Sequence, residues 1–484
     1  MSVPRVKHVA QTCAFQVCGL SIAPFLLLAL SVCGQTPLPQ RAAQPFCKAQ
    51  LCAASVKQRA AGVDASRADP SGRVNECGAA DGAESCSIPE LVGLLRERNP
   101  DLKAARQQLA QAEGKLKQAG IIPNPSLDLQ GGTDAPLTHD GEYALSASIT
   151  QPIETAGKRG KRMRVARWLV EAARAQAQDA ERTLTAQLQS LAGQALATQR
   201  RLQLMDDVDH LNQQMVSVME VRLRTGDASK LDQSLLLANT NQVRAQRLAV
   251  QNELASLLIQ IKTLAGMNPA DPLQLTGNLN PPALPLTEAE ALDQALQHRP
   301  DLRAARLEEQ MAAAGLALSR AEAVPDITAS LSFERDKSVF QHVLFQPGNF
   351  LQELNSLLAA GVSIPLPFFD RNQGNIRAAA AAQAQARFHR ESLERQVRQD
   401  VALAFQHYQA ARQSLAVYRG SVLPESRESL QIIRASYQLG EMRLLDVITQ
   451  QRLLINAETS YTTAQNDYYQ SLVDVERAIG RTLP

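Results

Sequence analysis

Two aspartates occupy matching places in a motif that occurs twice in this chain of 484 residues. Asp232 follows the run Thr225-Gly226-Asp227, and Asp446 follows Leu439-Gly440-Glu441. In both runs a glycine of the kind that ends helices precedes the start of a further apolar, helix-periodic segment. Ser229 precedes Asp232 by three positions, which is the spacing of a capping box, and an acidic residue there also favours the helix dipole. The pattern therefore predicts helix capping at this turn.

A second charged group is a run of basic side chains that follows an alternating segment. Its six members are Lys158, Arg159, Lys161, Arg162, Arg164 and Arg167. Positive charge is unfavourable at a helix N-terminus, so an anion should offset it. Phospholipid head groups and acidic side chains of a neighbouring helix both fit, and the sequence leaves the two alternatives open.

Residue types that carry catalysis or bind metals are sparse. The seven histidines are scattered, none lies in an HExxH or CxxC spacing, and His139 and His342 stand alone in expected loops. We find no spacing typical of a nucleophile and its base, and therefore expect neither an enzyme nor a cofactor or metal site. The net charge of +2 gives no electrostatic footprint for nucleic acid.

The amino terminus has the pattern of a targeting segment. Arg5 and Lys7 precede an apolar stretch over residues 20–32, which indicates a secretory signal over residues 1–33. The run Leu30-Ser31-Val32-Cys33 is similar to a lipoprotein cleavage box, so acylation of Cys33 is one alternative, and an uncleaved anchor is another. We expect residues 34–86 to be poorly ordered, with cysteines whose disulfide pairing the sequence does not resolve.

From residue 87 the chain repeats itself. Asn99-Pro100-Asp101-Leu102 returns 200 positions later as Arg299-Pro300-Asp301-Leu302, whereas Gly226 returns 214 positions later as Gly440. The second copy therefore carries an insertion of about 14 residues, which falls between residues 331 and 360. We predict two tandem repeats, over residues 87–280 and 281–484.

Each repeat has the periodicity of a helix, two strands, a very long helix, a turn and a further helix. The first helix should run from near Pro89 towards Gly120, and its counterpart should start at Thr287. Strand-like alternation occupies residues 126–130, 143–150, 327–334 and 358–364. The long helices are expected over residues 158–224 and 371–439, about 100 Å each at 1.5 Å per residue.

The second long helix contains the seam of a coiled coil. Apolar residues recur every three or four positions: Leu393, Val397, Val401, Ala404, Tyr408, Ala411, Leu415, Tyr418 and Val422. Pro424 removes one backbone hydrogen bond, so a kink is expected there.

The four strands carry one apolar and one polar face, and four strands are too few to close a barrel. In lipid an open edge leaves backbone groups without partners. A barrel shared between copies, apolar towards lipid and polar towards water, satisfies both faces. The alternative is a small soluble sheet beside a coiled coil.

At this point the chain resembles the TolC-like outer-membrane efflux proteins, and within them the CzcC-type subgroup associated with heavy-metal efflux. The resemblance rests on runs at residues 99–102, 123–125, 151–154, 157–159, 365–367, 437–440 and 445–447. It implies a mainly α fold with a small transmembrane β part, built as a homotrimer. The trimer would combine a 12-stranded β-barrel with an α-helical coiled-coil barrel that extends from the cell outer membrane into the periplasm.

The resemblance also assigns roles to the duplicated turns. It implies that they contact a periplasmic membrane-fusion adaptor of an inner-membrane RND-type pump, through Gly226, Asp227, Leu231, Gly440, Glu441 and Leu445. Asp232 and Asp446 match positions where family members carry acidic residues at the periplasmic constriction. Three copies of each would raise the negative potential on the axis and favour cations. Family members can carry a further Asp three residues later, where this chain has Thr449.

The predicted function is therefore a passive outer-membrane exit duct of a tripartite efflux system, with heavy-metal cations as the favoured substrate. Drug or small-molecule efflux and type I secretion use the same tube and stay open as alternatives. A protein of another class, a periplasmic coiled-coil adaptor or scaffold, would share the long helices.

Overall fold

The computed structural model describes residues 78–80, 83–134, 141–226, 228–341 and 350–481. The chain divides into residues 1–71 and 72–484, and only the second unit contains described residues. The predicted signal segment with Cys33, most of residues 34–86 and Asp227 lie outside the described residues. The described part is mainly helical, as predicted, and contains two sheets.

The helix expected at the start of each repeat is two helices in the structure. The first repeat has α1 (Ile88–Arg98) and α2 (Pro100–Ala119), and the second has α5 (Glu288–His298) and α6 (Pro300–Glu322). The break lies at Asn99 and Arg299, whose φ and ψ are −59° and 125°, and −60° and 122°. A proline disfavours the helical conformation of the residue before it, so each helix ends there and a new one begins at the proline.

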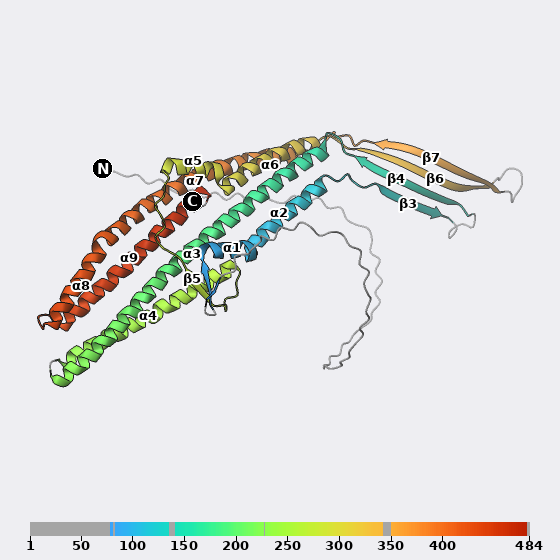
Figure 1. The fold of residues 1–484 in the computed structure, drawn as a ribbon. Helices are drawn as coiled ribbons and strands as arrows, with labels where there is room; N and C mark the ends of the chain where they lie inside the picture. The colour runs from blue at the N-terminus through green and yellow to red at the C-terminus, as the bar shows by residue number, and fades with distance from the viewer. Residues whose placement is uncertain (1–77, 81–82, 135–140, 227, 342–349, 482–484) are drawn as a thin grey trace, which may run out of the picture. The chain divides into compact units, whose positions relative to one another are not determined.

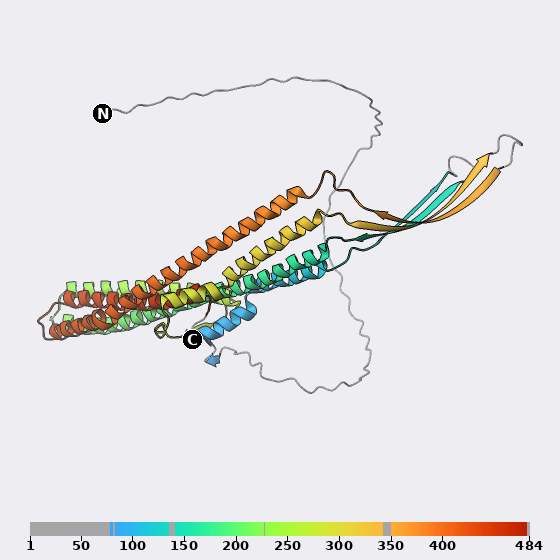
Figure 2. The ribbon, with the colours of Figure 1, turned by 90° about the horizontal axis from the view of Figure 1, so that it is seen from above.

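The long helices form where the sequence predicts them. α3 (Lys158–Thr225) is continuous and turns back into α4 (Lys230–Ala265). In the second repeat α7 (Gln373–Val417) and α8 (Leu423–Gln438) together match α3, and α9 (Leu444–Ile479) matches α4. Figures 1 and 2 show α3 beside α4 and α8 beside α9, with both turns at the end of the helices that is remote from the strands.

The interruption predicted at Pro424 takes the form of a π-helix. Residues Tyr418–Val422 form this π-helix, and α8 follows with Pro424 in its first turn. The proline has no N–H to donate and its ring crowds the carbonyl of residue 420, so the preceding turn widens. The first repeat has no proline at this position, and α3 is continuous.

Two apolar cores lie at equivalent places in the repeats. The first is built around Leu91, Leu95, Leu102, Leu188 and Ile261, all at most 1% exposed. The second contains the predicted seam residues Val397, Val401, Ala404 and Tyr408 with residues of α5 and α9. Alanine at many contact positions lets the helices approach closely, which accounts for the small aromatic content.

Equivalent hydrogen bonds join the beginning and the end of each repeat. Asn99 donates from Nδ2 to the carbonyl of Leu264 at 2.8 Å, and Arg299 donates from Nη1 to the carbonyl of Ala478 at 3.4 Å. Leu264 and Ala478 are matching residues, each two positions before the glycine that ends α4 or α9. The buried residue before each Pro-Asp-Leu run therefore joins the start of α2 or α6 to the end of the last helix.

The four predicted strands form one antiparallel sheet in the order β3-β4-β6-β7. β3 (Ser126–Thr133) and β4 (Tyr143–Ile153) are shorter than β6 (Ile327–Gln341) and β7 (Phe350–Ser363). The insertion of the second repeat thus lengthens a hairpin. The register places Leu127 opposite Ile149, and Ile149 opposite Leu331, so the apolar residues share one face.

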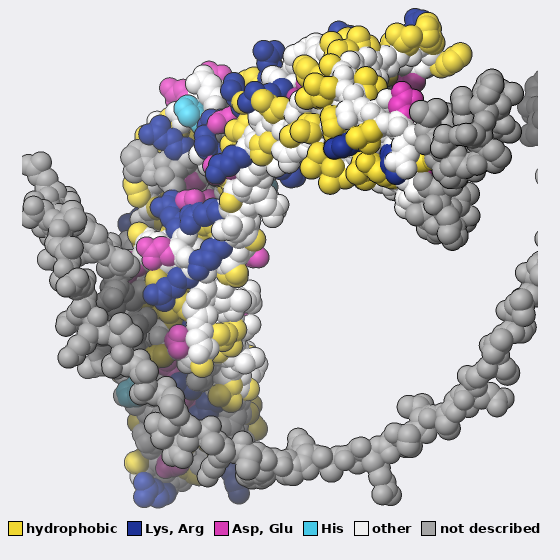
Figure 3. Space-filling model, turned by 90° about the vertical axis from the view of Figure 1, so that its right-hand side faces the viewer, with side chains coloured by type: hydrophobic (Ala, Val, Ile, Leu, Met, Phe, Trp, Pro, Cys, Tyr) yellow, Lys and Arg dark blue, Asp and Glu magenta, His cyan; other side chains and the backbone are white. Residues whose placement is uncertain are grey.

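This apolar face is exposed in the single chain. Leu129, Leu358 and Val362 are 71%, 69% and 70% exposed, and Figure 3 shows hydrophobic side chains gathered over the strands. Among the described residues β3 and β7 are each paired on one side only. No described helix has the length and hydropathy of a membrane-crossing segment.

A second, smaller sheet was not predicted. β1 (Gly78–Ala80) pairs with β2 (Ala83–Ser87), and β2 pairs in parallel with β5 (Leu273–Thr276) from the segment between the repeats. Cys86 in β2 is fully buried and disulfide-bonded. Residues 78–80 and 83–86 are therefore strands inside the segment that was expected to be poorly ordered.

Candidate functional site

The turn between α3 and α4 is capped at both ends. Gly226 ends α3 with φ of 85°, and Ser229 begins α4 with the predicted capping box. The Ser229 hydroxyl accepts from the Asp232 amide at 3.1 Å and donates to Asp232 Oδ2 at 2.7 Å. Asp232 therefore caps its helix, and it stays partly exposed.

The turn between α8 and α9 repeats this geometry with one change. Gly440 has φ of 82°, and Asp446 accepts from the backbone amide of Arg443 at 3.1 Å. Arg443 stands where the first repeat has Ser229, so this turn lacks the serine hydroxyl. Capping by the two aspartates is thus observed, and it leaves each carboxylate partly accessible to solvent.

Gly440→Ala is expected to lower the free energy of unfolding by about 1–2 kcal/mol, because the left-handed conformation brings a Cβ close to the following carbonyl oxygen. Urea unfolding followed by circular dichroism in detergent measures the change. The control is Gly315→Ala inside α6, where an added Cβ meets nothing within 4 Å and φ is not positive. Alanine is expected to stabilise the protein there by up to about 1 kcal/mol. Equal effects of the two substitutions would contradict the assignment of Gly440 as a left-handed helix cap that requires glycine.

The two turns are held against each other by an apolar cluster. Met219 of α3 and Leu236 of α4 pack with Leu444 and Ile448 of α9, all at most 4% exposed. The Arg222 guanidinium lies 5.2 Å from the centre of the Tyr437 ring, a cation–π contact between α3 and α8. The turns of both repeats thus form one surface.

A layer of polar side chains joins the two hairpins next to this cluster, on the side further from the turns. Gln451 of α9 donates to Asn212 of α3 at 2.9 Å, and both side chains are at least 98% buried. Arg452 donates to Asn239 and Gln242 of α4, each at 3.1 Å. The sequence analysis missed these residues, although polar side chains inside an otherwise apolar helix seam are the signal that marks such layers.

The basic run at the start of α3 is partly neutralised within the chain. Lys158 Nζ lies 2.7 Å from Asp326, and Arg162 pairs with Glu154. Arg164 and Arg167 are exposed and form no ion pair with another described residue. Acidic neighbours therefore account for part of the run, and a further anion is needed only for the remainder.

The structure brings most of the predicted residues together at one end of the helices. Leu231 is 68% exposed, Leu445 is 55% exposed and Glu441 is exposed, whereas Asp232 and Asp446 are partly covered beside them. Within the described residues no group of three or more His, Cys, Asp or Glu side chains is arranged to hold a metal ion. The surface formed by the two turns therefore presents both carboxylates and exposed leucine side chains to solvent.

A comparison with protein families identifies this architecture. The family described as outer membrane efflux protein matches residues 91–267 and again residues 291–481. The chain belongs to the outer membrane efflux protein family. The double match agrees with the internal repeat, and it favours a channel over the periplasmic adaptor or scaffold.

Two relatives in this family differ in what their names say they export. The cobalt-zinc-cadmium resistance protein CzcC of Cupriavidus metallidurans is 29% identical over 82% of this chain and 90% of its own length. The pyoverdine export outer membrane protein OpmQ of Pseudomonas putida is 24% identical over 82% of this chain and 86% of its own length. The resemblance to the CzcC-type subgroup is thus confirmed at the level of sequence similarity.

Solved structures share the fold. CusC superposes with a TM-score of 0.67 at 20% identity, covering 83% of this chain and 94% of that chain. The Vibrio cholerae outer membrane protein VceC gives a TM-score of 0.63 at 19% identity, covering 81% and 96%. As an outer membrane efflux protein, the chain is located in the cell outer membrane and extends into the periplasm.

Proposed function

We propose that this protein is the passive exit duct of a tripartite efflux system and that it works as a homotrimer. The observation that carries the proposal is the four-stranded sheet, whose described outer strands pair on one side only while its apolar face is exposed. Three copies joined edge to edge give 12 strands, which pair every strand, place the apolar face in lipid and enclose a polar lumen. The helical hairpins then line a periplasmic tube.

The turns are the proposed contact surface for a periplasmic membrane-fusion adaptor of an inner-membrane RND-type pump. Leu231, Leu439 and Leu445 are 68%, 76% and 55% exposed at the remote end of the hairpins. Gly226, Gly440 and Glu441 belong to the same proposed surface, and the prediction for Asp227 lies outside the described residues. Apolar side chains gathered at a helix tip favour a protein partner there.

Outer-membrane lipid is a proposed partner at the opposite end of the helices. Arg164 and Arg167, which have no ion-pair partner among the described residues, fit the phosphates of lipid head groups. Acylation of Cys33 would add an anchor and stays a prediction.

Heavy-metal cations are the proposed substrate. The similarity to CzcC supports this assignment, and the partly exposed carboxylates of Asp232 and Asp446 at the turns would favour cations when three copies surround an axis. Small-molecule export is the second candidate, because OpmQ is also similar to this chain.

Asp446→Asn is expected to lower the cation-over-anion permeability ratio of channels in planar bilayers, by an amount on the order of several-fold. Asparagine keeps an oxygen that can accept from the Arg443 amide, so the helix cap survives while three charges leave the constriction. Asp232→Asn tests in the same way whether the three copies of Asp232 also surround the channel axis.

Thr449→Asp is the matched opposite variant, because Thr449 is exposed one turn further along α9. Thr449→Asp should raise the preference for cations if the three Asp446 side chains surround the channel axis. Unchanged selectivity in both variants would contradict the proposed role of Asp446 at the constriction. Whether the protein forms a channel at all tests the duct separately.

A further inference from the structure

The helices next to the large sheet form a row that has the same order as its strands. α2 packs on α3, α3 on α6, and α6 on α7, while the strands follow as β3-β4-β6-β7 (Figure 2). The contact of α3 with α6, in the middle of the row, joins the first repeat to the second. α2 with β3 and α7 with β7 therefore stand at the two outer positions.

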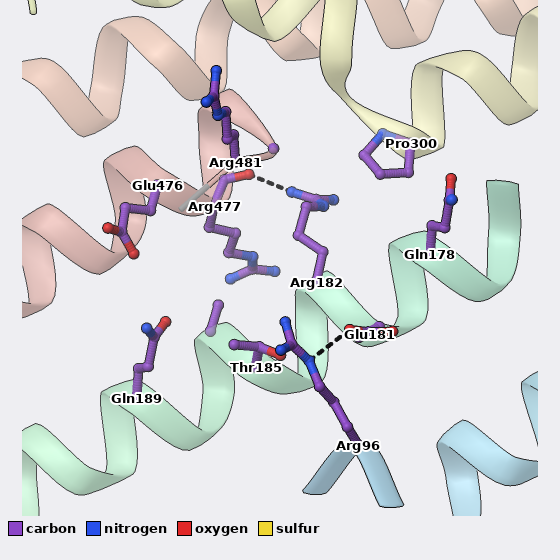
Figure 4. Close-up of a pocket in the computed structure, with 12 residues that line it drawn as sticks. Arg96, Gln178, Glu181, Arg182, Thr185, Gln189, Pro300, Glu476, Arg477 and Arg481 are labelled. Atoms are coloured by element: carbon purple, nitrogen blue, oxygen red, sulfur yellow. Dashed lines mark hydrogen bonds and ion pairs between the residues drawn. The ribbon is translucent and has the colours of Figure 1, made fainter. Parts of the chain in front are cut away.

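An ion pair marks the contact of α3 with α6. Arg182 of α3 lies 3.7 Å from Asp301 of α6, and the two side chains are only 13% and 19% exposed. The Arg182 guanidinium also donates to the carbonyl of Arg477 at the end of α9. Figure 4 shows Arg182 extending towards Arg477 and towards Pro300 at the start of α6. One arginine thus connects the second part of the first repeat to the second repeat.

Asp301 has a counterpart in the first repeat. Asp101 lies 200 positions earlier, in the same Pro-Asp-Leu run at the start of α2. It is exposed, and it forms no ion pair with a described residue. Asn99 stands where the second repeat has Arg299, so the bidentate arginine that holds Asp301 is missing as well.

Arg182 has a counterpart in the second repeat. Residues of the two apolar cores match between α3 and α7 at a step of 213 positions. The matched pairs are Leu184 and Val397, Leu188 and Val401, Ala192 and Phe405, and Ala195 and Tyr408. The π-helix at Tyr418–Val422 contains the extra residue that changes the step to 214 at Gly440. The step of 213 leads from Arg182 to Arg395.

Arg395 is exposed on α7 and forms no ion pair within the described part of the chain. Its guanidinium donates to the backbone carbonyl of Glu391 at 3.3 Å. The Glu391 carboxylate feels the charge of Arg395, but it pairs with Arg387 at 2.9 Å and lies 3.8 Å from Arg390. Asp101 and Arg395 are thus opposite charges whose counterparts contact each other where the two repeats meet.

We infer that α7 of one copy packs against α2 of the next copy as α3 packs against α6 within a chain, and that Arg395 pairs with Asp101 across this seam. The inference rests on the proposed homotrimer and names the side chains that join its copies. At the same seam β7 lies beside β3 of the next copy, so the two edges that are unpaired among the described strands meet. Three copies then close the row into a ring.

Burial decides how much the pair contributes. Exposed ion pairs contribute little to stability. The seam within the chain covers Arg182 and Asp301 almost completely, and an equivalent seam covers Arg395 and Asp101 in the same way. A desolvated charge pair at an interface acts mainly on the rate of dissociation.

Charge reversal tests the pair in the full chain, purified in detergent. Asp101→Arg places two arginines at each seam, and the trimer should dissociate at least roughly tenfold faster on dilution, because like charges brought together at an interface repel each other strongly. Asp101→Arg/Arg395→Asp exchanges the two charges and should recover most of the parent rate. Size-exclusion chromatography with light scattering, at intervals after dilution, measures the rate.

Cross-linking gives a second readout that does not depend on stability. A short thiol-reactive cross-linker applied to Asp101→Cys/Arg395→Cys should produce covalent dimers and trimers on denaturing gels. The parent chain and each single cysteine variant control for the native cysteines, all of which precede residue 87. Cross-linked products from the double variant at no more than their level would contradict the seam.

Glu97→Arg is the matched control for charge reversal. Glu97 is exposed on α1, which packs on α3 and α4 and lies outside the row of helices. The control should dissociate at the parent rate. Equal rates for Asp101→Arg and Glu97→Arg in a trimeric protein would overturn the seam and leave the homotrimer standing, and so would a charge exchange that recovers nothing. A parent chain that is monomeric in detergent would remove the proposed homotrimer, and the seam with it.

Discussion

Arg299→Ala is expected to lower the free energy of unfolding by about 3 kcal/mol, one of the two largest effects we foresee. The Arg299 side chain is 5% exposed and forms a bidentate pair with Asp301, from Nε at 3.1 Å and from Nη2 at 2.7 Å. Its Nη1 also donates to Asp400 at 2.9 Å. Removing the guanidinium leaves Asp301 partly buried, with the more distant Arg182 at 3.7 Å as its remaining cation. The value is set at the low end for buried pairs because Asp400 is 37% exposed.

The matched control is Arg306→Ala in α6, the helix that begins directly after Arg299. Arg306 lies 3.7 Å from Glu394, and the two side chains are 45% and 29% exposed, so a loss below about 1 kcal/mol is expected. Urea unfolding followed by circular dichroism measures both variants. Equal losses would show that the Arg299 cluster contributes no more than a surface pair.

The Arg299 contribution should also depend on pH. Burial opposes ionisation of Asp301, but the hydrogen bonds and charge of Arg299, with the charge of Arg182, hold the pKa of Asp301 below its ordinary value. A carboxylate with a lowered pKa in the folded state stabilises the protein fully above its unfolded pKa of about 3.9. This stabilisation is lost as the pH falls through the folded pKa. The difference between Arg299→Ala and the parent chain should therefore be full at pH 7 and shrink below about pH 4.

The helices and the large sheet could be predicted because periodicity records them locally. The course of α3 follows from apolar spacing and from the glycine that ends it, and alternation located all four strands. The predicted ranges 327–334 and 358–364 were too short, since β6 ends at Gln341 and β7 begins at Phe350. The break at Asn99 was missed because a proline in the first turn of a helix and a proline that divides two helices leave similar local patterns. The small sheet of β1, β2 and β5 depends on pairing between segments almost 190 residues apart, and no local pattern encodes such a partner.

The candidate site was only partly accessible from sequence. The duplicated turns revealed Asp232 and Asp446, because a repeat marks equivalent positions. The Asn212–Gln451 pair and the Arg222–Tyr437 contact join residues of different repeats, and their partners are fixed only once the hairpins pack.

Leu129→Arg is expected to destabilise the membrane-embedded protein by about 2–4 kcal/mol and to reduce the yield of the proposed trimer in outer membranes. Leu129 lies near the middle of β3, is 71% exposed and belongs to the apolar face. If that face contacts lipid, an arginine there must enter hydrocarbon. Resistance of the trimer to dissociation in unheated detergent gels measures folding, and urea unfolding in lipid vesicles measures the free energy.

Gln130→Arg is the control, because Gln130 is the next residue of the same strand, is also exposed and points to the polar face opposite Ser146. A lumen-facing arginine meets water, so its effect should be small. A soluble sheet beside a coiled coil predicts a different result, since an arginine replacing an exposed leucine would then be harmless. Equal behaviour of the two variants would therefore remove the lipid-facing assignment and, with it, the reason for three copies to share one barrel.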